Sequence, residues 1–256
     1  MSPVIEVSHL HHTYPDGTSA IRDVSFSIAA GESVGIIGAN GAGKSTMLLH
    51  LVACLQPTSG TLSIGGLLSH PGNVTAIRQR AGLVFQNPDD QLFMPTVQSD
   101  VAFGPRNQGL DEDSVTQRVT EALTAVGELH LLHRPPYRLS GGEKRAVSIA
   151  TVLSMRPDIL VLDEPSAGLD PSARRKLISL LSSLDHTRIV ASHDLDLVLD
   201  VCQRVILMRS GQVAADGPAR DILRDKPLLE QCGLELPLAA QACPNCGCSS
   251  DSPRSG

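Results

Sequence analysis

Short apolar runs alternate with polar stretches of helical spacing along most of the chain. The runs have the length of single strands and consist mainly of apolar residues, which is typical of strands buried on both faces. A representative helical stretch, residues 174–184, places its apolar side chains on one stripe. We therefore predict an α/β fold with a core of mostly parallel sheet; the runs cover residues 33–37, 82–85, 159–162, 188–191 and 205–208.

Two regions depart from this alternation. Residues 4–10 and 24–28 read as short strands that flank the turn-forming segment Pro15-Asp16-Gly17, so we predict an antiparallel β subdomain at the N-terminus. From residue 87 to about 155, polar segments that favour helix replace the strands. We predict a helical insertion over that range.

Composition excludes several classes of protein. A net charge of -6 and a pI near 5.8 leave no broad basic field for nucleic acid, so we expect no nucleic-acid partner. No uninterrupted apolar run reaches the roughly 18 residues of a membrane span, and the first residues lack the layout of a secretory signal. We expect a cytoplasmic protein whose contact with a membrane comes through a partner.

A glycine-rich loop follows the run at residues 33–37 and precedes a helix whose apolar spacing extends to Leu55. Strand, loop and helix in this order match a phosphate-binding loop, in which backbone N–H groups converge on a polyphosphate. Lys44 is expected to reach the β- and γ-phosphates, and the Ser45 hydroxyl to bind Mg²⁺. The predicted nucleotide contacts are Gly38, Asn40, Gly41, Gly43, Lys44, Ser45 and Thr46.

Two acids end the apolar run at residues 159–162. Asp163 is expected at the carboxyl edge of its strand, where ligands bind in open α/β sheets, and there it would hold Mg²⁺. Glu164 is the candidate general base, because that role needs a carboxylate near the γ-phosphate that the metal does not occupy. A strand or turn cap is the alternative role for both acids.

The segment Leu139-Ser140-Gly141-Gly142-Glu143 resembles the signature of the ATP-binding cassette (ABC) ATPases. In that family the serine and glycines meet the γ-phosphate of ATP held by the opposite subunit, so the resemblance implies nucleotide contacts at Ser140, Gly141 and Gly142 across a dimer. An ordinary capping box, with Ser140 as cap and Glu143 three residues on, is compatible with this role. Ala146 departs from the family, in which many members carry a basic residue.

Other resemblances to the family extend over nearly the whole chain. Tyr14 resembles the aromatic residue that stacks on adenine, and Gln86 the glutamine that senses Mg²⁺ and the membrane partner. His193 resembles the switch histidine, and Asp170 belongs to a segment that resembles the loop linking the two ATP sites. The resemblance thus implies a catalytic set of Glu164, His193 and Gln86, with ATP and Mg²⁺ as ligands and Mg²⁺ held by Ser45, Gln86 and Asp163.

The segments at residues 85–93 and 100–105 resemble the energy-coupling factor importers of cobalt, nickel and vitamins. This resemblance implies an ATPase at the cytoplasmic face of the membrane, paired with a second ATPase subunit that is identical or related. A transmembrane component would contact residues 86–94, with Leu92, Phe93 and Met94 as apolar contacts, and a cargo-binding membrane protein would complete the complex. Ordinary core packing is the alternative for those three side chains.

The chain ends in a Cys-, Ser- and Pro-rich segment, so we predict one domain over residues 1–236 and a flexible tail over 237–256. Its thiols at Cys243, Cys246 and Cys248 suit Zn²⁺, Ni²⁺ or Co²⁺, although a fourth ligand is missing locally and an unstructured reactive tail is the alternative. They favour a cobalt or nickel cargo over a vitamin. A soluble regulatory ATPase with a metal-sensing tail, and a metal-binding module regulated by nucleotide, remain as other hypotheses.

Overall fold

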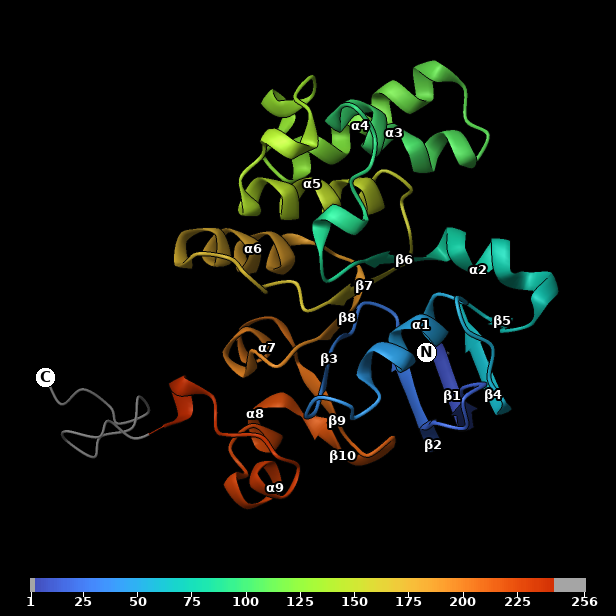
Figure 1. Cartoon of the computed structure of the whole chain (residues 1–256), viewed down its shortest axis with the longest axis vertical. Helices are drawn as coiled ribbons and strands as arrows, with labels where there is room; N and C mark the ends of the chain where they lie inside the picture. Colours follow the sequence, from blue (N-terminus) through green and yellow to red (C-terminus); the bar gives the residue numbers. More distant parts are fainter. Residues whose placement is uncertain (1–2, 242–256) are drawn as a thin grey trace, which may run out of the picture.

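The computed structural model describes residues 3–241, and two sheets organise them (Figure 1). The first sheet lies at the N-terminal end of the chain and is four-stranded and antiparallel, in the order β2-β1-β4-β5. Its long strands alternate buried and exposed residues, because only one face packs on the core. The strands are β1 (Pro3–Thr13), β2 (Ser19–Ala29), β4 (Ser59–Ile64) and β5 (Leu67–Leu68).

The second sheet is six-stranded, in the order β10-β9-β3-β8-β7-β6. Strands from β9 to β6 are parallel, and β10 pairs with β9 in the antiparallel sense. The parallel strands are almost wholly buried because helices or the first sheet cover both of their faces. The strands are β3 (Ser33–Ile37), β6 (Ala81–Val84), β7 (Ile159–Asp163), β8 (Thr187–Ala191), β9 (Arg204–Arg209) and β10 (Gln212–Pro218).

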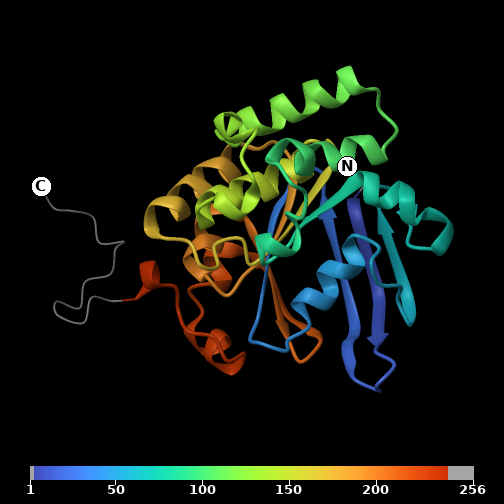
Figure 2. The same ribbon diagram turned by 45° about the horizontal axis from the view of Figure 1, so that its top comes forward.

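Helices divide the apolar core into three parts. One part joins α1 and the first sheet to one face of the second sheet, and another joins α5, α6 and α7 to the opposite face. A third lies among α3, α4 and α5; α3 and α4 lie at the top of Figure 2, and α5 packs between them and the second sheet. The helices are α1 (Lys44–Leu51), α2 (Val74–Arg80), α3 (Val97–Asn107), α4 (Glu112–Ala125), α5 (Gly141–Leu153), α6 (Pro171–Ser183), α7 (Leu195–Val201), α8 (Ala219–Ile222) and α9 (Lys226–Gln231).

The predicted fold class is confirmed, but local elements differ from the prediction. Helix α1 ends at Leu51, before Leu55, since Ala53 adopts a left-handed φ of 51°. Strands β4 and β10 have no predicted counterpart, because they carry few buried side chains and so lack a continuous apolar run. Within residues 3–241, none of the helices combines the length and apolar character needed to cross a membrane.

Candidate functional site

The glycine loop joins β3 to α1, as the sequence predicts. At Gly38 a Cβ atom would lie 2.4 Å from the carbonyl oxygen of Met208, and at Gly43 it would lie 2.7 Å from that of Ala20. Both residues also have positive φ values, 154° and 102°. The loop therefore needs glycine at these positions for backbone conformation and for close packing against neighbouring main chain.

Lys44 is the first residue of α1, and its side chain folds back over the loop. Its Nζ atom donates hydrogen bonds to the carbonyl oxygens of Gly38, at 2.7 Å, and Ala39, at 3.2 Å. Burial lowers the pKa of the Lys44 ammonium, while the carboxylates of Glu164 and Asp163 act in the opposite direction. The loop thus holds a positive charge that faces two acids.

Asp163 ends β7 beside the loop, as predicted. Burial raises the pKa of its carboxyl group, as does the neighbouring Glu164 charge, whereas the Ser45 hydroxyl hydrogen-bonds to it and favours ionisation. A hydroxyl and a carboxylate in contact provide the hard oxygen ligands that Mg²⁺ prefers. The residues present therefore fit a Mg²⁺ ion.

Glu164 and His193, which are far apart in the sequence, lie in contact. Nδ1 of His193 is 2.8 Å from Oε2 of Glu164, which also accepts a hydrogen bond from the Ser192 hydroxyl at 3.0 Å. The carboxylate accepts the backbone N–H of His193 as well. Glu164 is buried and has a left-handed φ of 44°. Two hydrogen-bond donors and the close His193 ring thus fix one carboxylate next to the metal-binding acid, and sequence reasoning missed the donor from Ser192.

Tyr14 follows β1 and lies over the start of α1. Its hydroxyl is 3.1 Å from the Thr46 hydroxyl, and its ring makes an edge contact with the buried His12 ring, at 4.7 Å between centroids. This contact places an aromatic side chain next to the glycine loop, which suits a residue that stacks on a nucleotide base.

Gln86 lies at the surface after β6, and its main chain is held by a residue that sequence reasoning did not single out as functional. The buried Arg145 guanidinium donates to the carbonyl oxygens of Phe85, at 2.7 Å, and Gln86, at 2.5 Å. Arg145 belongs to α5, so this contact links the segment after β6 to the signature helix. The available signal was a charged residue within the apolar stripe of a helix.

The residues after Gln86 divide between core and surface. Leu92 is buried in the core of the α3, α4 and α5 layer, so our prediction of Leu92 as a surface contact is wrong and the core-packing alternative holds for it. Phe93 is 62% exposed and packs edge-on against Phe103, at 5.1 Å between ring centroids. Met94 is partly exposed. An aromatic surface patch thus follows the segment held by Arg145.

The signature begins α5 with a complete capping box. Ser140 accepts the Glu143 N–H at 3.3 Å, and Glu143 Oε2 accepts the Ser140 N–H at 2.7 Å. Ser140 and Gly141 are nevertheless exposed, and Gly142 is partly exposed. Since α5 and α1 pack on opposite faces of the second sheet, one chain does not bring the signature to its own glycine loop (Figure 1).

The loop before α6 is tied to the neighbourhood of His193. Asp170 caps α6 by accepting the N–H groups of Ser172 and Ala173, which lower the pKa of its carboxyl group. Asp194 forms a bidentate ion pair with Arg174, in which Nε and Nη2 donate to the two carboxylate oxygens at 2.9 and 3.1 Å. It also accepts a hydrogen bond from the Ser166 hydroxyl at 3.1 Å. Residues 166–170 are therefore connected to the residue that follows His193.

The remaining candidates are cysteines. Cys243, Cys246 and Cys248 lie outside the described residues. Among the described ones, Cys202 is buried, and burial raises the pKa of its thiol to about 12, so it behaves as an inert core residue.

Residues 21–167 match a family model described as ABC transporter. A putative ABC transporter ATP-binding protein of Geobacter sulfurreducens is 58% identical, covering 95% of this chain and 98% of its own. The energy-coupling factor transporter ATP-binding protein EcfA of Methanothermobacter thermautotrophicus is 46% identical, and the match covers 93% of this chain and 78% of EcfA.

Two solved structures share the fold. One is cbiO1 of Clostridium perfringens, described as part of the ABC transporter complex cbiONQ; it is 37% identical with a TM-score of 0.81 and covers 90% of this chain and 94% of its own. The other is a dimeric ATP-binding cassette in a post-hydrolysis state bound to ADP and Pi. It is 28% identical with a TM-score of 0.75, and the match covers 84% of this chain and 99% of its own.

Proposed function

Because the chain belongs to the ABC transporter family of ATP-binding proteins, which hydrolyse ATP to drive transport, we propose that it energises an energy-coupling factor importer. It acts in this proposal at the cytoplasmic face of the membrane, and residues 1–236 form its ATPase domain. The names of the EcfA and cbiO1 relatives support this branch of the family.

The proposed chemistry divides among residues that the fold brings together. Lys44 and the backbone of the glycine loop bind the ATP phosphates, and Tyr14 stacks on adenine. Ser45 and Asp163, with Gln86, would hold Mg²⁺, and the bound ion would supply positive charge to the ATP phosphates. Glu164 accepts a proton from the attacking water, and His193 orients that carboxylate through its 2.8 Å contact and faces the γ-phosphate.

Two chains are needed to complete each ATP site in this proposal. Ser140, Gly141 and Gly142 are on the surface and on the opposite side of the sheet from the same chain's Lys44, so they can complete a second chain's site. Asp170 lies at the same surface, at the start of α6. The dimeric cassette bound to ADP and Pi supports such an arrangement. The second chain is a further copy or a related subunit.

An aromatic groove on the surface supports the proposed contact with a membrane partner. Phe85, Phe93 and Phe103 are 41%, 62% and 43% exposed and line a cavity of about 590 Å³ between α2 and the α3, α4 and α5 layer. Exposed aromatics gathered in one concave surface are typical of a binding site. We assign the groove to a coupling helix of the transmembrane component, which also contacts residues 86–94.

The proposed cargo is a transition metal ion, cobalt or nickel, delivered by a cargo-binding membrane protein. The thiols of Cys243, Cys246 and Cys248 support a metal cargo, because three soft ligands within six residues suit such ions. The alternative is uptake of a vitamin by the same machinery. The identity of the accompanying cargo-binding protein distinguishes the two cargoes.

Co-purification from native membranes tests the proposal. The tagged wild-type chain should recover a multi-spanning protein together with a small cargo-binding membrane protein. Phe93→Asp should lose both, whereas Leu238→Asp, which changes an equally apolar residue that is 76% exposed far from the groove, should keep them. A soluble dimer without membrane proteins, under conditions that preserve membrane complexes, would contradict the importer proposal and favour a soluble regulatory ATPase.

A further inference from the structure

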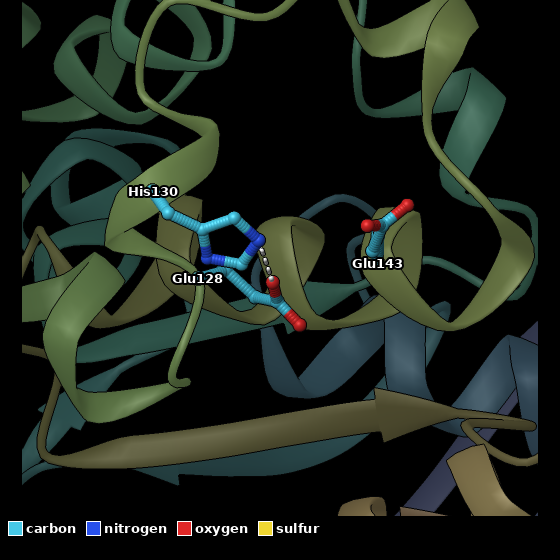
Figure 3. A group of neighbouring side chains, drawn as sticks. All are labelled: Glu128, His130 and Glu143. Atoms are coloured by element: carbon cyan, nitrogen blue, oxygen red, sulfur yellow. Dashed lines mark ion pairs between the residues drawn. The ribbon is translucent and has the colours of Figure 1, made fainter.

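Three metal-ligating side chains meet beside the signature turn, outside the groups assigned to ATP (Figure 3). Glu128 and His130 come from the segment that follows α4, and Glu143 lies in the first turn of α5. One ligand atom from each residue lies within 4.8 Å of the other two. The fold thus gathers an imidazole nitrogen and two carboxylates from separate segments.

The cluster contains a largely buried carboxylate, that of Glu128, to which no group within residues 3–241 donates a hydrogen bond. The Glu128 side chain is only 15% exposed, and its contact with His130 Nε2 is 3.8 Å long, beyond hydrogen-bonding distance. Two acids that repel each other around an imidazole are an arrangement that a cation stabilises.

Space for a cation and its water ligands lies next to the three side chains. They line a cavity of about 370 Å³ between the start of α5 and α6, together with Ser140 and Lys176. Oε2 of Glu143 accepts the Ser140 N–H, and the Ser140 side chain also hydrogen-bonds to this carboxylate, so the signature turn orients it at the cavity. A tetrahedral ion could therefore take three protein ligands and one water from the cavity.

We propose that Glu128, His130 and Glu143 form a regulatory binding site for a divalent transition-metal cation of the Zn²⁺ type. An imidazole with carboxylates suits these ions, whereas Ca²⁺ and Mg²⁺ favour oxygen ligands alone. Because Glu143 also holds the main chain of Ser140, the bound cation ties the segment after α4 to the signature turn. Its occupancy thereby slows the closure of two chains around ATP.

Direct contact of His130 with the two carboxylates, without any cation, is the competing explanation of the cluster. It predicts the same side-chain positions but no affinity for Zn²⁺. Calorimetric titration with ZnCl₂ separates the two, and the measurement needs neither ATP turnover nor a membrane partner. The untagged full chain is used with Cys243→Ser, Cys246→Ser and Cys248→Ser in every sample, so that the tail thiols do not bind the ion.

The expected result is one Zn²⁺ per chain, with nitrogen and oxygen ligands in the X-ray absorption spectrum. His130→Ala and Glu128→Gln should each weaken binding about tenfold or more, because each removes a ligand. His133→Ala, which changes an exposed histidine three residues away, should bind as the parent does. Equal affinity in the parent, His130→Ala and Glu128→Gln would overturn the site.

A rate measurement tests the regulatory part. Saturating Zn²⁺ should lower the ATP turnover of the parent several-fold more than that of His130→Ala, since any exchange of Zn²⁺ for Mg²⁺ at the ATP site affects both proteins equally. Equal inhibition of the two proteins would overturn the coupling to the signature turn. The transport proposal is unaffected by either result, because neither experiment involves a membrane partner.

Discussion

The glycine-loop region and the signature region differ in how far their polar groups are buried. Around the loop, Lys44 and Glu164 are buried, Asp163 is partly buried, and all three bond to groups of the same chain. At the signature, Ser140 and Gly141 are exposed on the far side of the sheet. The comparison indicates that the chemical groups are preorganised within one chain, whereas in the proposed dimer the exposed signature completes the site of a second chain.

The largest expected effect comes from the loop side. Glu164→Gln should bind ATP, form a stable ATP-bound dimer and hydrolyse ATP about 10² to 10⁴-fold more slowly, because the amide cannot accept the proton of the attacking water. Phosphate release and size-exclusion chromatography with ATP measure the two effects. Near-normal turnover would remove Glu164 from the role of general base.

Lys44→Ala should weaken ATP binding about 10 to 100-fold, because it removes a charge-assisted contact with the phosphates. Titration with a fluorescent ATP analogue measures the change. Lys226→Ala is the matched control, since Lys226 lies on α9 in an exposed pair with Glu230. Unchanged affinity in Lys44→Ala would contradict the assignment of the loop.

Ser140→Ala tests the signature side. It should leave ATP binding to a single chain intact and reduce hydrolysis about tenfold or more, because it removes a donor from the opposing site. Mixing Lys44→Ala chains with Ser140→Ala chains should restore part of the activity, since one of the two sites in a mixed dimer is then intact. If the mixture is no more active than its components, sites shared between chains are excluded.

The last expected effect is on stability and concerns the ion pair that connects α6 to the residue after His193. Arg174→Gln should lower the free energy of unfolding at pH 7 by about 1 to 3 kcal/mol, because it breaks a partly buried paired hydrogen bond with Asp194. Urea titrations at several pH values measure it.

The pH dependence of that effect has a defined sign. Burial alone would raise the pKa of Asp194, but the bonds from Arg174 and the Leu197 N–H keep it below its usual value. The stabilisation is therefore complete above the unfolded pKa of about 3.9 and is lost as pH falls through the lower folded pKa. A difference between wild type and Arg174→Gln that persists below the folded pKa would contradict the ion-pair explanation.

Sequence reasoning predicted the features that contiguous residues determine. The glycine loop, the acids that end β7 and the capping box at Ser140 depend on neighbours in the chain, so their patterns are local. For Glu164 and His193 the sequence indicated a separate catalytic role for each, and the structure adds the 2.8 Å contact between them.

Features that depend on long-range packing were not predicted correctly. Leu92 and Phe93 are neighbours with similar apolarity, yet one is buried and the other is 62% exposed. The core that contains Leu92 combines the neighbouring α3 with residues of α4 and α5, which are distant in sequence, and Arg145, which holds residues 85 and 86, is distant as well. No local pattern contains that information, and the same holds for the edge strand β10, whose residues alternate between exposed and partly buried.

The contact between Arg145 and the segment after β6 has an evolutionary consequence. The guanidinium bonds to carbonyl oxygens at positions 85 and 86, not to side chains. Mutations that change those two side chains therefore leave the link between groove and signature helix in place. The side chains of the proposed partner surface can therefore change over evolution without loss of the mechanical connection to the signature helix.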